Sequence, residues 1–126
     1  MAADNIPEVV RRLIAERIDS IPELEAILLL RQGSTQPWNV EDTGKRLYVS
    51  PLVAAHILHV LTERGFLSCS DDKYRYEPDD AKLAEAVDLL ATTYSRHLIE
   101  VTKIVHAKPS ASVRLFAAAF RLRKDR

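Results

Sequence analysis

Two histidines, His56 and His59, are the first residues whose type and spacing suggest chemistry. They lie three residues apart in a segment with helical spacing, so both side chains are expected on one face of a helix. Imidazole nitrogens placed in this way can bind a metal ion, but a metal site needs three or four ligands. A polar surface or a contact with phosphate is therefore the favoured interpretation of this pair.

Cys69 is the only cysteine in the chain. It has no partner for an internal disulfide and no second thiolate for a metal site, and a redox sensor would need a resolving cysteine. A thiol that packs within a strand is the favoured interpretation. A single cysteine is typical of a reducing compartment. Because the sequence also lacks a signal-peptide pattern and a membrane-spanning run, we expect a cytoplasmic protein.

Catalytic motifs are missing from the sequence. It contains no G-x-S-x-G, no phosphate-binding loop, no H-E-x-x-H and no Cys–His pairing at a supporting distance. We therefore expect no enzyme activity, no cofactor and no metal site. The length of 126 residues suits about one domain, and only three glycines argue against a turn-rich all-β fold.

The net charge of zero hides an uneven distribution. Residues 1–80 carry nine Lys or Arg and fourteen Asp or Glu, whereas residues 108–126 carry six and one. The basic tail 121–126 could bind DNA phosphates or acidic protein, or it could neutralise the acidic body. Overall composition therefore gives no general support for nucleic-acid binding.

The N-terminal third is expected to form two helices. Apolar residues at helical spacing predict a lead-in helix over 6–18, within a segment of residues 1–19. Ser20 and Glu23 form a capping box, which begins a helix that is apolar nearly all round and is expected to be the core helix. Gly33 is expected to end it in the left-handed conformation.

Two shorter helices and a hairpin should follow. Asn39 can cap a helix over 40–47, and Ser50 with Pro51 begins a helix over 51–64. Large apolar and polar residues then alternate on both sides of an acidic turn, which predicts a hairpin. Trp38 is expected to be a short extended piece attached to this hairpin or an anchor for the core.

The C-terminal part is expected to be a long helix and a short one. Capping residues at 78–80 and a proline at 109 delimit a helix over 81–108. Its apolar residues repeat in steps of four and three, which is typical of a coiled-coil face, so residues 79–108 are predicted to form a dimer. The predicted interface consists of Leu83, Val87, Leu90, Tyr94, His97, Leu98, Val101 and Ile104. Residues 109–126 are expected to form a short helix with a basic tail.

Two segments resemble a known family. Arg46-Leu-Tyr-Val-Ser-Pro51 resembles the turn and the start of the recognition helix in bacterial winged-helix regulators, and Leu61-Thr-Glu-Arg-Gly-Phe-Leu67 resembles the exit of that helix into the wing. Residues 20–78 are thus similar to a winged helix-turn-helix, and the added long helix resembles the dimeric repressors of the MarR and PadR types. The resemblance implies a mainly α fold with one hairpin wing and a homodimeric, DNA-binding transcriptional regulator.

The resemblance assigns the DNA contacts to the helix over 51–64, the turn before it and the wing. Arg64, at the helix end, is a further candidate for a phosphate contact. However, no Arg, Lys, Asn or Gln lies between Ser50 and Thr62, although these are the types that read base edges best. The predicted DNA-binding residues are Lys45, Arg46, Ser50, His56, His59, Lys73 and Arg75.

A second function follows from the same helix. Leu52, Val53 and Val60 form an outward apolar strip, which is the kind of surface that is buried against a protein. On this alternative, the winged helix binds a transcription or signalling protein rather than DNA. A third possibility is an effector pocket between the long helix and the winged body, as in related repressors, although no sequence feature identifies one.

Overall fold

The computed structural model describes residues 5–108. This part contains helices and one two-stranded antiparallel hairpin, as predicted: α1 Glu8–Arg17, α2 Ile21–Gln32, α3 Val40–Leu47, α4 Pro51–Glu63, β1 Leu67–Ser70, β2 Lys73–Tyr76, α5 Ala81–Arg96 and α6 Leu98–His106. The predicted last helix and basic tail lie outside the described residues. No helix within 5–108 is long and apolar enough to cross a membrane.

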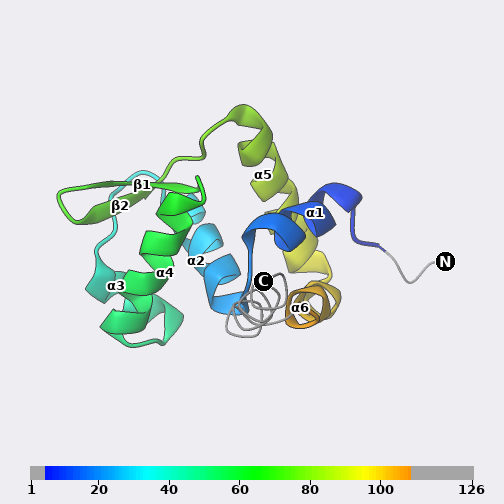
Figure 1. Ribbon diagram of the computed structural model, residues 1–126, viewed down its shortest axis with the longest axis horizontal. Coiled ribbons are helices and arrows are strands. Elements are labelled where there is room, and N and C mark those ends of the chain that lie inside the picture. The colour runs from blue at the N-terminus through cyan, green and yellow to red at the C-terminus, as the bar shows by residue number, and fades with distance from the viewer. Residues whose placement is uncertain (1–4, 109–126) are drawn as a thin grey trace, which may run out of the picture.

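Helix α2 occupies the centre of the molecule. Figure 1 shows α3, α4 and the hairpin on one side of it, and α1, α5 and α6 on the other. Leu24, Ala26, Ile27 and Leu30 of α2 are completely buried. The prediction that this segment is the core helix is therefore confirmed, and its burial explains why it is apolar nearly all round.

Short polar side chains begin four of the helices by accepting hydrogen bonds from backbone amides that have no partner inside the helix. In each case the acceptor is the residue just before the helix and the amide belongs to the residue three positions on. The pairs are Ser20 Oγ with Glu23 N (3.3 Å), Asn39 Oδ1 with Asp42 N (2.7 Å), Ser50 Oγ with Val53 N (3.2 Å) and Asp80 Oδ1 with Leu83 N (2.8 Å).

The turn between α3 and α4 is tight. Tyr48 has a left-handed backbone with φ of 59°, and Val49 N donates to Gly44 O at 3.0 Å. Gly44 is buried, and a Cβ atom there would lie 3.0 Å from Val49 O. A larger residue would therefore push the turn away from α3, so the glycine in the interior of this short helix is explained by packing.

The hairpin turns at Asp71 and Asp72, whose φ values are 54° and 61°. Positive φ at both central residues is the requirement of a type I′ turn, and aspartate tolerates it better than most residues. The register pairs Ser68 with Arg75 and Ser70 with Lys73. Side chains alternate between the two faces of a strand, so these four lie on one face.

Trp38 joins the loop before α3 to the hairpin. Its N–H donates to Tyr74 O at 2.7 Å, and Tyr74 N donates to Trp38 O at 2.8 Å. The indole is buried, and its Nε1 donates to Gly33 O at 3.1 Å. Both predicted roles of this residue are thus confirmed. Gly33, in contrast, is not left-handed as predicted (φ −98°, ψ 40°); the indole ring limits it instead, because a Cβ there would lie 2.7 Å from Trp38 Cζ2.

Gly65 follows the end of α4 with a φ of 92°, and a Cβ there would lie 2.4 Å from Asp79 Oδ2. We expect Gly65→Ala to lower the free energy of unfolding by about 1 to 3 kcal/mol, because the backbone strain and the close contact add together. Urea unfolding measures this loss. In Gly65→Ala/Asp79→Ala the contact is gone and the backbone strain stays, so an undiminished loss there would assign the whole effect to the backbone.

The prediction of a single long helix over 81–108 is wrong. The chain bends at His97, where φ is −132° and ψ is 52°, and the segment forms two helices, α5 and α6. No proline or glycine lies near the bend. After the bend Val101 and Val105 are buried, and α6 packs on α1 and α2. A straight helix would have carried these two valines away from the core.

The bend also changes the meaning of the apolar repeat. Leu83, Val87, Leu90 and Val101 are buried in the core of the chain itself, so these side chains are not free to form an interface between two chains. Tyr94, His97 and Ile104 are half-buried, and the Tyr94 hydroxyl lies 3.2 Å from Glu25 Oε2. Of the predicted interface residues, only Leu98 is exposed.

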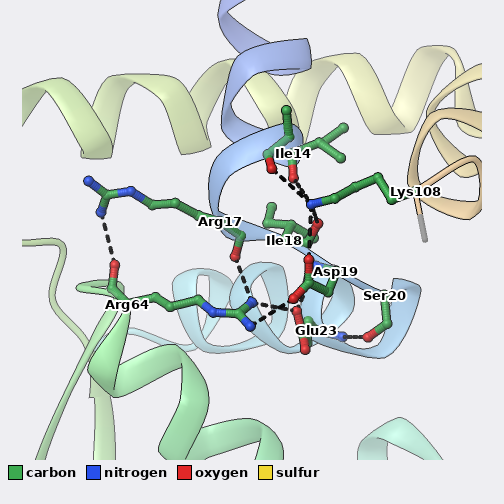
Figure 2. A network of polar contacts seen from close by, with 9 residues as sticks. Ile14, Arg17, Ile18, Asp19, Ser20, Glu23, Arg64 and Lys108 are labelled. Atoms are coloured by element: carbon green, nitrogen blue, oxygen red, sulfur yellow. Dashed lines mark hydrogen bonds and ion pairs between the residues drawn. The ribbon is translucent and has the colours of Figure 1, made fainter. Parts of the chain in front are cut away.

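A network of charged groups connects α4 to the segment between α1 and α2 (Figure 2). The Arg64 guanidinium donates to Asp19 Oδ2 at 2.9 Å, to Glu23 Oε1 at 2.8 Å and to Arg17 O at 2.9 Å, and Arg17 donates in return to Arg64 O. Arg64 therefore has several partners inside the protein, although its side chain is 28% exposed. It is a less favourable candidate for a phosphate contact than the exposed basic residues.

Lys108 connects α6 to the same segment (Figure 2). Its Nζ donates to Ile18 O at 2.6 Å, to the carbonyl of Ile14 and to Ala15 O at 3.1 Å, and lies 3.0 Å from Asp19 Oδ1. These carbonyls belong to the last turn of α1 and the residue after it, where a cation is stabilising. The end of α6 is thus fixed to the end of α1.

Candidate nucleic-acid interface

Helix α4 has one buried face and one exposed face. Ala54, Ile57, Leu58 and Leu61 are buried, as the sequence predicted. The predicted DNA-binding residues of this helix, Ser50, His56 and His59, are all exposed. The N-terminal part of α4 is therefore exposed to solvent, with short polar and apolar side chains on the accessible side.

Two basic residues precede α4. Lys45 and Arg46 are exposed in the last turn of α3, and the Arg46 guanidinium carbon lies 5.6 Å from the centre of the Trp38 ring. A guanidinium above an aromatic face is attracted by it, which limits the orientations of this long side chain. Arg46 is thus held beside Trp38, with its charge accessible.

The hairpin provides a second basic group. Ser68, Ser70, Lys73 and Arg75 line a shallow hollow of about 240 Å³ together with Pro37 and Asp71. Two hydroxyl donors and two cations on one face are suited to phosphate oxygens, although the Asp71 carboxylate lowers the local positive potential. The sequence identified Lys73 and Arg75 but missed the two serines, because only the strand register places them beside the basic residues.

The opposite face of the hairpin holds Tyr74, which is paired across the strands with Cys69. Burial, and then a hydrogen bond with the thiol, raises the pKa of the Tyr74 phenol, so it is neutral at physiological pH. Cys69 lies in the strand as predicted, but it is exposed rather than packed. The neutral tyrosine adds no charge to the hairpin.

The histidines of α4 are not brought together with further ligands. His59 Nε2 lies 3.3 Å from Glu63 Oε2, one turn along the helix. Within residues 5–108, no group of three or more His, Cys, Asp or Glu side chains could hold a metal ion. Because Glu63 neighbours His59, this histidine is the less favourable phosphate contact of the two.

An apolar tip surrounds the beginning of α4. The side chain of Leu52 is 83% exposed and that of Tyr48 is 95% exposed, and Val53 is exposed beside them. Val60, the third residue of the predicted protein-binding strip, is only half-buried and lies two turns further along the helix. The sequence placed Tyr48 in the turn but gave no sign that its left-handed backbone would leave the ring in solvent.

A separate hollow of about 740 Å³ lies between α1 and α5, at the other end of the molecule. The expected effector pocket was between the long helix and the winged body, whereas this hollow is bordered by the lead-in helix. Acidic and basic side chains from both helices, including Arg12 and Lys82, share it with exposed Val9 and Leu89. Its mixed lining specifies no ligand.

Comparison of the chain with known protein families, with curated proteins and with solved structures finds no match in any of the three. The function is therefore argued from the arrangement of α3, α4 and the hairpin alone.

Proposed function

We propose that the chain is a winged helix-turn-helix protein that binds double-stranded DNA and regulates transcription. The order of elements supports this proposal, because a core helix, a short helix, a tight turn, an exposed helix and a hairpin follow one another from α2 to β2. In this interpretation α4 enters the major groove and the hairpin is the wing that contacts the backbone beside it.

The observation that carries the proposal is the polar face of the hairpin. Lys73 and Arg75 point to the same side as Ser68 and Ser70, and none of these four side chains has an ion-pair partner among the described salt bridges. Cations that are exposed and have no ion pair within residues 5–108 are available to replace the counterions of DNA. The other predicted contacts, Lys45 and Arg46, lie on the approach to α4.

The proposed regulator acts as a homodimer on a palindromic site, so that two copies of α4 read two half-sites. Since most of the apolar repeat of α5 and α6 is buried within the chain, the dimer must use other surface, and exposed Leu98 on α6 is one available contact. Sedimentation equilibrium tests this: a monomer at all concentrations, with and without DNA, excludes the dimeric form of the proposal.

The experiment that tests DNA binding is a fluorescence-anisotropy titration against random duplex DNA and fragments of the protein's own promoter, at about 50 and about 200 mM salt. Genuine phosphate binding weakens steeply between these concentrations because bound counterions are released. We expect salt-sensitive binding that prefers one promoter fragment. A lack of binding at the lower salt concentration would reject the proposal.

A second candidate function is supported by one observation, the exposed apolar tip with Leu52 83% accessible to solvent. Such a surface is also suited to a protein of the transcription or signalling apparatus, which would cover Leu52, Val53 and Val60. The basic hairpin face has no role in this alternative. The DNA titration therefore decides between the two candidates.

If the partner is a protein, Val53→Asp should abolish the complex, because a carboxylate would be buried in an apolar contact without a partner. The fold should survive, since Val53 is exposed. Co-purification of partners with the tagged protein and with the variant measures this effect. A matched substitution, Val9→Asp on α1, removes a similarly exposed valine elsewhere (51% against 44%) and should leave the complex intact.

A further inference from the structure

We propose that α4 selects DNA by contact with the 5-methyl groups of thymine rather than by hydrogen bonds to base edges. The proposal rests on the DNA-binding function above and names the feature of the DNA that the helix recognises. The residues that carry it are Leu52 and Val53, in the first turn of α4.

The first step concerns what α4 lacks. Its exposed N-terminal part has no Arg, Lys, Asn or Gln, so no side chain can make a bidentate contact with guanine or adenine. Ser50 Oγ already accepts the hydrogen bond of Val53 N as the helix cap, 3.2 Å away. The other polar side chain on this part of the helix, His56, is exposed and does not cap the helix.

The second step concerns what α4 exposes. Leu52 is the most accessible apolar residue of the helix, at 83%, and Val53 lies next to it. An exposed leucine at the tip of a helix is stabilised when an apolar group covers it. In the major groove, the methyl group of thymine is the apolar group among the base edges, whereas the other edges present donors and acceptors that leucine cannot satisfy.

The third step concerns charge. Basic residues lie on both sides of the apolar tip along the chain: Lys45 and Arg46 are in the last turn of α3, just before the turn that leads to α4, and Lys73 with Arg75 are on the hairpin that follows α4. In a duplex, negatively charged phosphates border the groove that holds the thymine methyl groups, so the charges of the two surfaces are opposite. This complementarity favours DNA over a protein as the occupant of the tip, even though Glu41 and Asp42 begin α3.

The test compares an alternating dA–dT duplex with the same duplex in which deoxyuridine replaces thymidine. Uracil keeps every hydrogen-bonding group of thymine and lacks only the methyl group. We expect the thymine duplex to bind about fourfold more tightly for one covered methyl group and about fifteenfold for two. The reverse change, methylation of cytosine C5 in an alternating dG–dC duplex, should increase affinity because it places a methyl group at the same position in the groove.

Two variants assign the effect to α4. Leu52→Ala/Val53→Ala should bring the thymine-to-uracil affinity ratio close to one, while Leu89→Ala, which shortens an exposed leucine on α5, should leave the ratio unchanged. A ratio that persists in the double variant would overturn the assignment, because the preference for thymine would then come from the shape of the DNA and not from contact with α4.

The remaining outcomes separate the inference from the function on which it depends. Equal, salt-sensitive binding to both duplexes would overturn methyl recognition and leave DNA binding in place. Lack of binding to any duplex at about 50 mM salt would reject both, and the apolar tip would then be a protein-docking surface.

Discussion

Replacing Lys73 and Arg75 together with alanine is expected to weaken binding to every duplex by the same factor. If each side chain replaces counterions at one phosphate, the slope of log affinity against log salt should decrease by about 1.8, and affinity at about 50 mM salt should fall on the order of a hundredfold. Both residues are exposed, so the fold should be unaffected. Anisotropy titrations at several salt concentrations measure both quantities.

The α1–α5 hollow offers a matched control. Arg12 and Lys82 are an arginine and a lysine that are also exposed and line a hollow, and they lie on α1 and α5 rather than on the hairpin. Arg12→Ala/Lys82→Ala removes the same charge and should change the salt dependence little. An equal loss in both double variants would show a general charge effect, and an unchanged slope in the hairpin variant would exclude this face as a phosphate site.

The sequence predicted features that depend on neighbouring residues. Each capping side chain bonds an amide only three residues away, so the local sequence was sufficient to locate the beginnings of these helices. The capping residues are Ser20, Asn39, Ser50 and Asp80. The hairpin was predicted for the same reason, since alternation and an acidic turn are local signals.

The bend at His97 could not be predicted in this way. No proline or glycine marks it, and its cause is the position of α1 and α2, against which Val101 and Val105 pack. The apolar repeat showed correctly that one face of the segment is buried. It could not show whether another part of the same chain or a second chain covers that face. The spacing of apolar residues reports that a helix face is buried, and it is the same whichever chain covers the face.

The role of Arg64 was missed for a related reason. A basic residue at a helix end has the same local sequence whether it is free in solution or paired, and its partners Glu23 and Asp19 lie 41 and 45 residues earlier in the chain. The serines of the hairpin face were missed because their position beside Lys73 and Arg75 requires the strand register.

Arg64 is the position where we expect the largest loss of stability. Its guanidinium satisfies Asp19 and Glu23, whose side chains are only 14% and 12% exposed, and also bonds Arg17 O. Arg64→Ala would remove the guanidinium from two mostly buried carboxylates, while Lys108 would still lie near Asp19. Loss of one partner of a fully buried pair costs about 3 to 5 kcal/mol. Because Arg64 itself is 28% exposed, we expect a loss of about 2 to 3 kcal/mol in urea unfolding.

The Arg31–Asp88 pair is the matched control for this prediction. Arg31 Nε lies 3.0 Å from Asp88 Oδ1, close to the 2.8 and 2.9 Å of the Arg64 ion pairs, but the side chains are 35% and 62% exposed. Arg31→Ala should therefore cost less than about 1 kcal/mol, since water screens an exposed pair and solvates the remaining carboxylate. The two sites differ in burial and in the number of acceptors that the arginine serves. If Arg64→Ala costs no more than Arg31→Ala, the contacts in Figure 2 do not hold α4 to the segment between α1 and α2.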